Sequence, residues 1–157
     1  MASGHQRDVE LTLTLCLPRD AASVPLSRRV ASELLKSVGF HTEDVGDVEL
    51  AMTEACSNVL RHSGAGDEYD LHLTVDGSTV VIEIEDKGPG FPEHLSQLGT
   101  DDADTEAETG RGIQLMRALV DDLRFERAPN DGAVVRMVRQ MRTEPGSPAA
   151  AILLGGC

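Results

Sequence analysis

The chain has 157 residues, of which 27 are acidic and 14 are basic, so its formal net charge at pH 7 is -13. This length suits one domain and is enough to bury a hydrophobic core without disulfides or metals. The acidic composition argues against direct nucleic-acid binding and against adhesion to anionic membranes, because both need basic side chains.

The first expected elements are a strand and a helix. Residues 9–17 alternate apolar and polar side chains, which predicts a half-buried strand. Pro25 suits the first turn of the helix that follows, with Ser23 as a candidate cap and Gly39 as the end. An apolar stripe recurs at helical spacing along this segment: Leu26, Val30, Leu34 and Val38.

A longer helix and a hairpin follow. The helix is predicted from Thr42 to the glycines at positions 64 and 66. Its apolar stripe has alternating gaps of three and four residues: Val45, Val48, Met52, Ala55 and Val59. Asp76-Gly77 then separates two runs of alternating residues, which is a strong hairpin signal.

The second half of the chain begins with an acidic segment. Residues 92–109 contain six acidic residues and no Lys or Arg, which predicts a long polar loop. A third helix is expected to open at Gly110, and the runs 123–128 and 133–141 form a second hairpin around the turn at 130–132.

This order of elements predicts the fold and the domain boundaries. Hairpins make the sheet largely antiparallel, though mixed, and helices on one face of it give a two-layer α/β sandwich. We expect one domain over residues 9–142, with a disordered N-terminus at 1–8 and a disordered tail at 143–157.

The cysteines and the apolar runs bear on the location of the protein. Three scattered cysteines are too few for a disulfide framework, and the sequence contains no CxxC motif that would indicate structural zinc. The run at 11–17 is a poor secretory signal, and the run at 149–154 is too short to span a membrane. We therefore expect a reduced, cytoplasmic protein without a membrane segment.

Glu54 and Asn58 are the first candidate functional pair. They are four residues apart on the second predicted helix, so they project from one face at the edge of its apolar stripe. Most such pairs only form a solvated helix surface. The functional alternative is a carboxylate that takes a proton beside an amide oxygen that holds Mg²⁺.

Two glycine-rich motifs complete the candidate set. Asp86 ends a predicted strand and could accept a hydrogen bond from an exocyclic amine, while Gly88 and Gly90 would let backbone pass close to a flat ligand. Gly110-Arg111-Gly112 at a helix start could cradle a phosphate, with Arg111 as a charge partner. Each motif alone is also typical of an ordinary turn or helix start.

Together, in this order, the motifs resemble the GHKL ATP-binding superfamily, which includes gyrases, chaperones, histidine kinases and mismatch-repair proteins. EACSNVLRH is similar to its N-box, DKGPGF to its G1 box and GRGIQLMRALVDD to its G2 box. The resemblance covers residues 9–141 and implies a Bergerat-type ATP-binding fold. A free-standing domain of this size most resembles the bacterial anti-sigma factor serine/threonine kinases.

The resemblance implies roles for the candidate residues. Glu54 would be the general base toward a serine hydroxyl, and Asn58 would ligate Mg²⁺ bridging the ATP phosphates. Asp86 would bind the adenine amine, and residues 92–109 would form the lid. The remaining residues implied to bind the nucleotide are Gly88, Gly90, Gly110, Arg111 and Gly112.

Two positions depart from the pattern of these kinases. Gly132-Ala133 stands where the family often has Gly-Thr, whose hydroxyl helps to hold adenine through water. Glu108 and Thr109 stand where an arginine can approach the terminal phosphate. These departures argue against phosphotransfer more than against nucleotide binding.

The resemblance implies a Mg·ATP-dependent kinase that sequesters a sigma factor and phosphorylates an anti-sigma factor antagonist, acting as a homodimer. One alternative is a binding module of the same fold without useful catalysis. A catalytic fragment from a histidine-kinase lineage is a third hypothesis, disfavoured because no dimerisation helix with a phospho-acceptor histidine precedes the domain.

Overall fold

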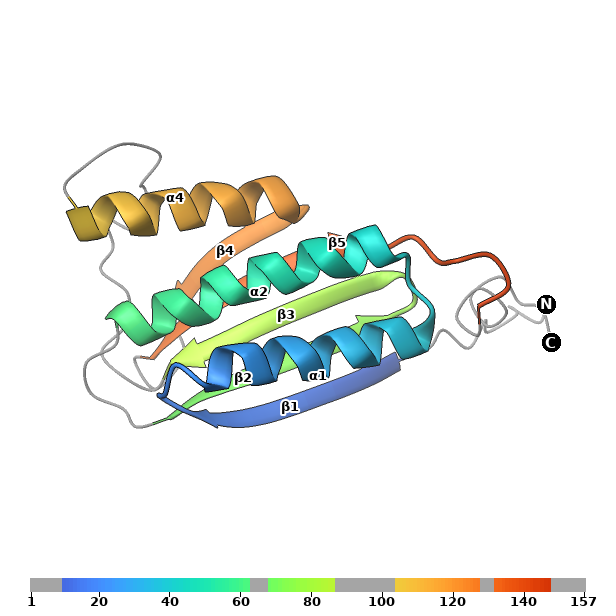
Figure 1. Ribbon diagram of the computed structural model, residues 1–157, viewed down its shortest axis with the longest axis horizontal. Helices are drawn as coiled ribbons and strands as arrows, with labels where there is room; N and C mark the ends of the chain where they lie inside the picture. The colour runs from blue at the N-terminus through green and yellow to red at the C-terminus, as the bar shows by residue number, and fades with distance from the viewer. Residues whose placement is uncertain (1–9, 63–67, 87–103, 128–131, 148–157) are drawn as a thin grey trace, which may run out of the picture.

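The computed structural model describes residues 10–62, 68–86, 104–127 and 132–147. Within these ranges, five strands form one sheet in the order β1-β2-β3-β5-β4, and every pairing is antiparallel. Three helices lie against one face of this sheet (Figure 1). The structure confirms the predicted two-layer α/β sandwich, but within the described ranges its sheet is wholly antiparallel and not mixed.

The first three strands form a meander. β1 (Glu10–Pro18) pairs with β2 (Glu68–Asp76), and β2 turns into β3 (Thr79–Asp86). The turn is tight because Gly77 adopts a positive φ of 60°, and Asp76 therefore pairs with Thr79 as the hairpin signal predicts. Alternate residues of β2 and β3 are buried beneath the helices, and apart from Val81 the other face of these two strands carries polar side chains.

The second predicted hairpin is also present. β4 (Asp122–Arg127) pairs with β5 (Ala133–Gln140), and β5 lies beside β3 in the middle of the sheet. β1 and β4 are therefore the two edge strands.

Helix α1 (Ser23–Val38) differs in two respects from the prediction. Ser23 is not the cap: its hydroxyl donates to the Asp20 carbonyl at 2.7 Å and lies 2.5 Å from the Tyr69 hydroxyl. The buried face also differs from the predicted stripe, because Leu26 is 53% exposed whereas Leu35 is fully buried. Small residues share the buried face of α1: Ser27, Ala31 and Ser32. As predicted, Gly39 ends the helix, with a left-handed φ of 101°.

Helix α2 (Thr42–His62) is the central helix of the layer, and its predicted stripe is correct. All five stripe residues are at most 1% exposed, and they pack against the buried faces of the central strands: Val45, Val48, Met52, Ala55 and Val59. Although α2 has 21 residues, no helix in the described ranges is long and apolar enough to cross a membrane.

Helix α4 (Asp104–Leu119) begins six residues before the predicted start at Gly110. The predicted loop at 92–109 is therefore too long at its C-terminal end. The sequence offers a physical reason, because Glu106, Ala107 and Glu108 favour helix formation and acidic residues stabilise a helix N-terminus. The earlier part of that predicted loop, up to residue 103, lies outside the described residues.

The chain beyond β5 is ordered for longer than predicted. The expected tail starts at residue 143, but Thr143 pairs with Phe40 and the Glu144 N–H donates to the Gly39 carbonyl at 2.8 Å. This segment therefore packs against the junction of α1 and α2. Residues 1–9 and the last ten residues lie outside the described ranges.

A buried ion pair holds the start of α2 to the end of the sheet. The Asp44 side chain, 2% exposed, accepts hydrogen bonds from Arg139 at 2.9 Å and from Arg142 at 2.7–3.1 Å. Burial raises the pKa of Asp44, but the hydrogen bonds from Arg142 and Arg139 outweigh it and lower that pKa to about 2. The carboxylate thus stays charged and fixes α2 against β5.

Candidate active site between α2 and α4

Glu54 and Asn58 lie on one face of α2, where it meets α4. Asn58 is 1% exposed and Glu54 is half-buried. Because their neighbours Ala55 and Val59 point into the core, these two polar side chains are turned to the edge of the helix layer. The prediction that the pair shares a helix face therefore agrees with the structure.

Gly112 of α4 lies directly against this pair. A methyl group added at Gly112 would lie 2.7 Å from Glu54 Oε2 and 3.8 Å from Asn58 Oδ1. Glycine therefore lets the Glu54 carboxylate approach the backbone of α4 closely. At Gly110, half a helical turn earlier, an added methyl group would have no neighbour within 4 Å among the described residues outside its own helix backbone.

A cavity of about 330 Å³ opens beside this contact. Its lining combines one carboxylate with two guanidinium groups on facing helices: Glu54, Arg61, Arg111, Gly112 and Leu115. Guanidinium groups pair with phosphate oxygens, and a carboxylate can accept a proton from a hydroxyl. The side chains here suit the phosphate end of a nucleotide.

Arg61 is a residue that the sequence analysis did not assign to the site. Its Nη1 donates a hydrogen bond to Asn58 Oδ1 at 3.4 Å. The signal was available, because Arg61 follows Asn58 by three residues and so lies on the same face of α2. An amide oxygen has two lone pairs, so Asn58 can accept from Arg61 and still offer one lone pair to a cation.

Asp86 is placed at the end of β3, buried to 1% exposure. Asp86 is not among the residues that line the cavity. The end of β3 nevertheless lies at the same end of the molecule as the C-terminal half of α2 (Figure 1). Asp86 pairs with Ala133 of β5, so the departure from the Gly-Thr pattern lies beside it. Gly88 and Gly90 lie outside the described residues.

The predicted phosphate cradle at a helix start is not found at Gly110 and Gly112. Both glycines lie inside α4, well after its first residue, Asp104, so they are not at the helix N-terminus. The free N–H groups of a helix lie in its first turn, and those of α4 belong to residues before Gly110. The contribution of Gly112 is close approach to Glu54 instead. Glu108 and Thr109 also belong to α4, but the structure does not describe their side chains.

Cys56 is a packing residue of the hydrophobic core. It is fully buried, and this burial raises the pKa of its thiol to about 11. A thiol of this kind is not a nucleophile near neutral pH.

Comparison with known proteins identifies the family of the chain. Residues 17–139 match the family model described as the histidine kinase-like ATPase domain. The chain belongs to this family. Its sequence resemblance to the GHKL superfamily is therefore confirmed, and the match includes the positions of Glu54, Asn58, Asp86 and Gly112.

Relatives to which this chain is similar are named serine-protein kinase RsbW. The protein of Bacillus licheniformis is 26% identical over 136 residues, covering 81% of this chain and 84% of its own. That of Listeria monocytogenes is 28% identical over 135 residues, covering 80% and 82%. The fold matches a crystal structure of the RsbU and RsbW domains of a Mycobacterium tuberculosis protein. The TM-score is 0.64 at 17% identity, over 87% of this chain and 34% of that one.

Proposed function

We propose that this protein is an ATP-dependent serine/threonine kinase that also acts as an anti-sigma factor. The observation that carries the proposal is the contact of Glu54 and Asn58 with Gly112, beside a cavity with two arginines. Its support is the family membership of the chain and its similarity to serine-protein kinases RsbW.

The residues that line the cavity, together with Asn58 beside it, are of the types that bind Mg·ATP. Asn58 Oδ1 would hold Mg²⁺, which reduces the negative charge of the phosphates when it is bound. Arg61 and Arg111 would pair with phosphate oxygens from opposite sides of the cavity. Asp86 would accept a hydrogen bond from the adenine amine, and Gly88 and Gly90 would shape the adenine pocket.

Glu54 would act as the general base. It takes the proton of the substrate hydroxyl as that oxygen forms a bond to the γ-phosphorus, while the bond from phosphorus to the ADP oxygen breaks. The products are a phosphoserine or phosphothreonine and ADP. Gly112 lets this carboxylate lie close to the bound phosphates, since a larger residue would displace it.

The protein substrate would be an anti-sigma factor antagonist. In this scheme the kinase holds a sigma factor until the unphosphorylated antagonist displaces it, and phosphorylation of the antagonist reverses the exchange. The reaction would take place in the cytoplasm, where sigma factors act. The surface of the kinase would bind proteins rather than nucleic acid, in keeping with a net charge of -13.

Phosphotransfer from γ-labelled ATP to the cognate antagonist tests the proposal. Glu54→Gln keeps the shape of the side chain and removes the base, so transfer should fall by roughly 10²-fold or more while ATP still binds. Glu49→Gln is the matched control, because Glu49 is on the same helix but lines a separate groove with Leu50. Equal transfer by both variants would remove Glu54 from its role.

The same assay separates the kinase from a binding module. Ala133 lies opposite Asp86 and carries a methyl group, whereas the family often has a threonine hydroxyl at this position. The missing hydroxyl favours weak nucleotide binding. Stoichiometric binding of a sigma factor with no phosphorylated antagonist at any ATP concentration would support the module and contradict the kinase.

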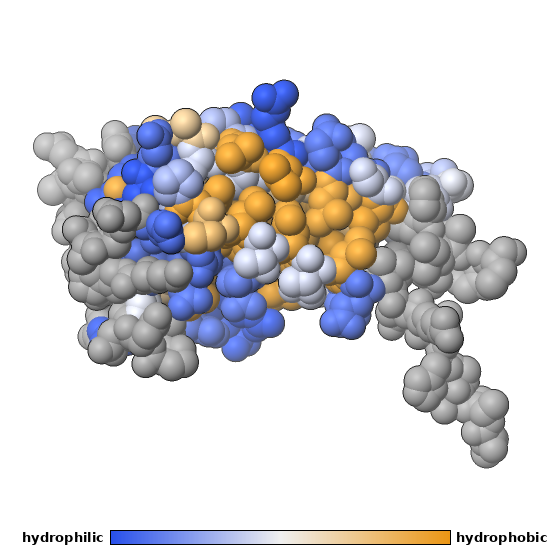
Figure 2. Space-filling view, turned by 90° about the horizontal axis from the view of Figure 1, so that it is seen from below, coloured by the Kyte–Doolittle hydropathy of each residue, from blue (hydrophilic) through white to orange (hydrophobic). Residues whose placement is uncertain are grey.

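We also propose that the protein is a homodimer through β1 and α1. Figure 2 shows a broad hydrophobic surface on one side of the molecule, and β1 and α1 are the elements nearest that side in Figure 1. Leu11 of β1 is 38% exposed and Leu26 of α1 is 53% exposed. β1 is an edge strand, and exposed edge strands beside apolar surfaces favour association.

Sedimentation analysis tests the dimer. Leu26→Lys should shift the protein toward monomer, whereas Leu50→Lys should not, because Leu50 is similarly exposed at 43% but lies on α2. A monomeric wild type, or equal behaviour of the two variants, would contradict this interface.

A further inference from the structure

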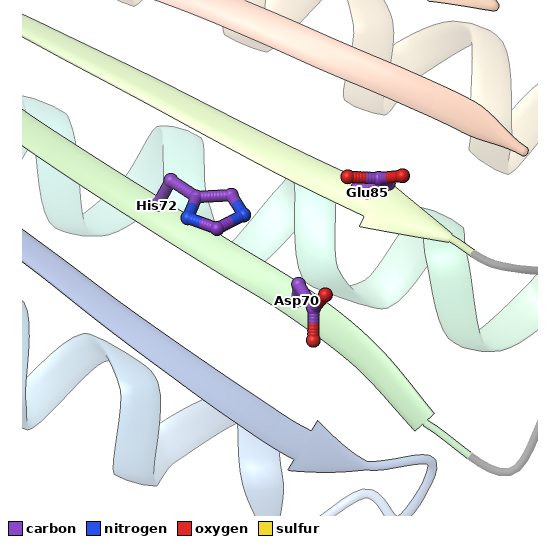
Figure 3. Close-up of side chains that lie close together, drawn as sticks. All are labelled: Asp70, His72 and Glu85. Carbon is purple, nitrogen blue, oxygen red and sulfur yellow. The ribbon is translucent and has the colours of Figure 1, made fainter. Parts of the chain in front are cut away.

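Three side chains that could bind a metal gather on the face of the sheet opposite the helices (Figure 3). Asp70 and His72 belong to β2, and Glu85 belongs to β3. One ligand atom of each lies within 4.8 Å of the others, and all three residues are half-buried. Asp70 and Glu85 are direct partners in the antiparallel ladder, so the backbone register itself sets this grouping.

The imidazole of His72 is oriented toward the two carboxylates. Its Nδ1 lies 3.2 Å from Thr14 Oγ1 on the neighbouring strand β1. When Nδ1–H donates to this hydroxyl, the lone pair is on Nε2, and Figure 3 shows the ring extending toward Asp70 and Glu85. Metal-binding histidines are commonly held in this way by a hydrogen bond from their second nitrogen.

The local charges favour a cation. Like charges placed directly opposite each other in a sheet are destabilising, and Asp70 faces Glu85 in this way. Glu83 is opposite His72 in the ladder, and on its other side it faces Arg136 of β5. Among the described residues, Glu85 has no ion pair with an arginine or lysine. A divalent cation between the strands would offset this repulsion.

The spacing is compatible with a bound ion. Bonds of about 2.0–2.2 Å to a tetrahedral zinc ion put its ligand atoms about 3.4 Å apart. The atoms of Asp70, His72 and Glu85 lie within 4.8 Å, so each needs to move by about an ångström, which rotation about side-chain bonds supplies. A water molecule would complete the coordination.

We propose that Asp70, His72 and Glu85 form a binding site for a divalent transition metal ion of the Zn²⁺ type. One imidazole nitrogen with two carboxylate oxygens suits Zn²⁺, whereas Mg²⁺ and Ca²⁺ prefer oxygen ligands alone. The site is separate from Glu54 and Asn58, which lie in the helix layer on the other face of the sheet. A bound ion would link β2 to β3 and so stabilise the sheet.

Calorimetric titration of the tag-free, EDTA-treated full chain with ZnCl₂, without nucleotide, tests the proposal. We expect binding of one equivalent that weakens at least about tenfold in His72→Ala and in the isosteric Glu85→Gln. Thr14→Val should weaken it by about tenfold, because the imidazole loses its orienting partner. His41→Ala is the matched control: His41 lies 3.7 Å from the single carboxylate of Glu144 and should leave the affinity unchanged.

Thermal unfolding provides a second readout and a check that the variants fold. ZnCl₂ should raise the unfolding temperature of the wild type and His41→Ala by the same amount, and should not raise that of His72→Ala. No binding at millimolar ZnCl₂ would overturn the proposal. So would binding that His72→Ala and Glu85→Gln retain, or binding lost only in Cys16→Ser, whose Sγ donates to Glu68 at 3.2 Å.

Discussion

Replacing Gly112 with alanine should leave the stability of the protein nearly unchanged but lower its phosphotransfer activity. Alanine in a helix interior is favoured over glycine by roughly 0.5–1 kcal/mol. The new methyl would lie 2.7 Å from Glu54 Oε2, whereas ordinary contacts begin at 3.4 Å. Glu54 must therefore leave its rotamer, at a cost of roughly 0.5–1.5 kcal/mol. These terms nearly cancel, so the free energy of unfolding should change by less than about 1 kcal/mol.

The displaced Glu54 carboxylate should nevertheless lower phosphotransfer, since a misplacement of about 1 Å can reduce a rate on the order of 10²-fold. Urea unfolding and the antagonist assay measure the two effects. Gly110→Ala serves as the stability control, because it gains the helix propensity and its methyl would have no neighbour within 4 Å among the described residues outside its own helix backbone. In a Glu54→Ala background, Gly112→Ala should stabilise as much as Gly110→Ala does. If Gly112→Ala stabilises the wild type to that same extent and leaves transfer unchanged, Gly112 does not hold Glu54 in place.

Three further outcomes are expected. Asn58→Ala should abolish or sharply weaken the calorimetric binding of Mg·ATP while the circular dichroism spectrum is retained, because the proposed Mg²⁺ ligand is gone. Ala133→Ser should tighten ATP binding by about two- to tenfold, the range of one added hydrogen bond; no change would mean that position 133 does not reach the nucleotide. The pKa of Asp44 is about 2 in the folded state, against an ordinary value of 3.8. The ionised carboxylate therefore contributes about 2 kcal/mol to the free energy of unfolding above pH 4, and this contribution is lost as the pH falls through 2. Asp44→Asn should therefore flatten the pH dependence of urea unfolding between pH 5 and 2, and an unchanged slope would exclude that ion pair as its cause.

The central elements of the fold were predictable because their patterns are unambiguous. The α2 stripe from Val45 to Val59 is fully buried, and Asp76-Gly77 sets the register of its hairpin. Helix α1 is harder to predict, because Leu26 and Leu34 of the predicted stripe are not buried, whereas Leu35 is. Small side chains such as Ser27 fit close to α2, where its Oγ lies 3.8 Å from Cys56 Sγ, and the Ser27 hydroxyl donates to the Val24 carbonyl at 2.8 Å.

The candidate site was predictable in part for a similar reason. Residues on one helix share a face by periodicity alone, so Glu54 and Asn58 could be paired from the sequence. The contact with Gly112 depends on how α4 packs against α2. The predicted start of α4 is wrong because a run of acidic residues is typical both of a polar loop and of a helix N-terminus. The cluster at His72 and Glu85 needs the pairing of two strands and has no motif in the sequence.

The order of the strands has a consequence for how the molecule responds to its ligand. β1, β2 and β3 with α1 and α2 form one half, and α4, β4 and β5 form the other. The halves meet where β3 pairs with β5 and where α2 packs on α4. Glu54 and Asp86 come from the first half, and Arg111 and Gly112 come from the second. A nucleotide bound between them would act as a non-covalent crosslink, so that two polypeptides divided between residues 86 and 104 should reassemble more tightly in its presence.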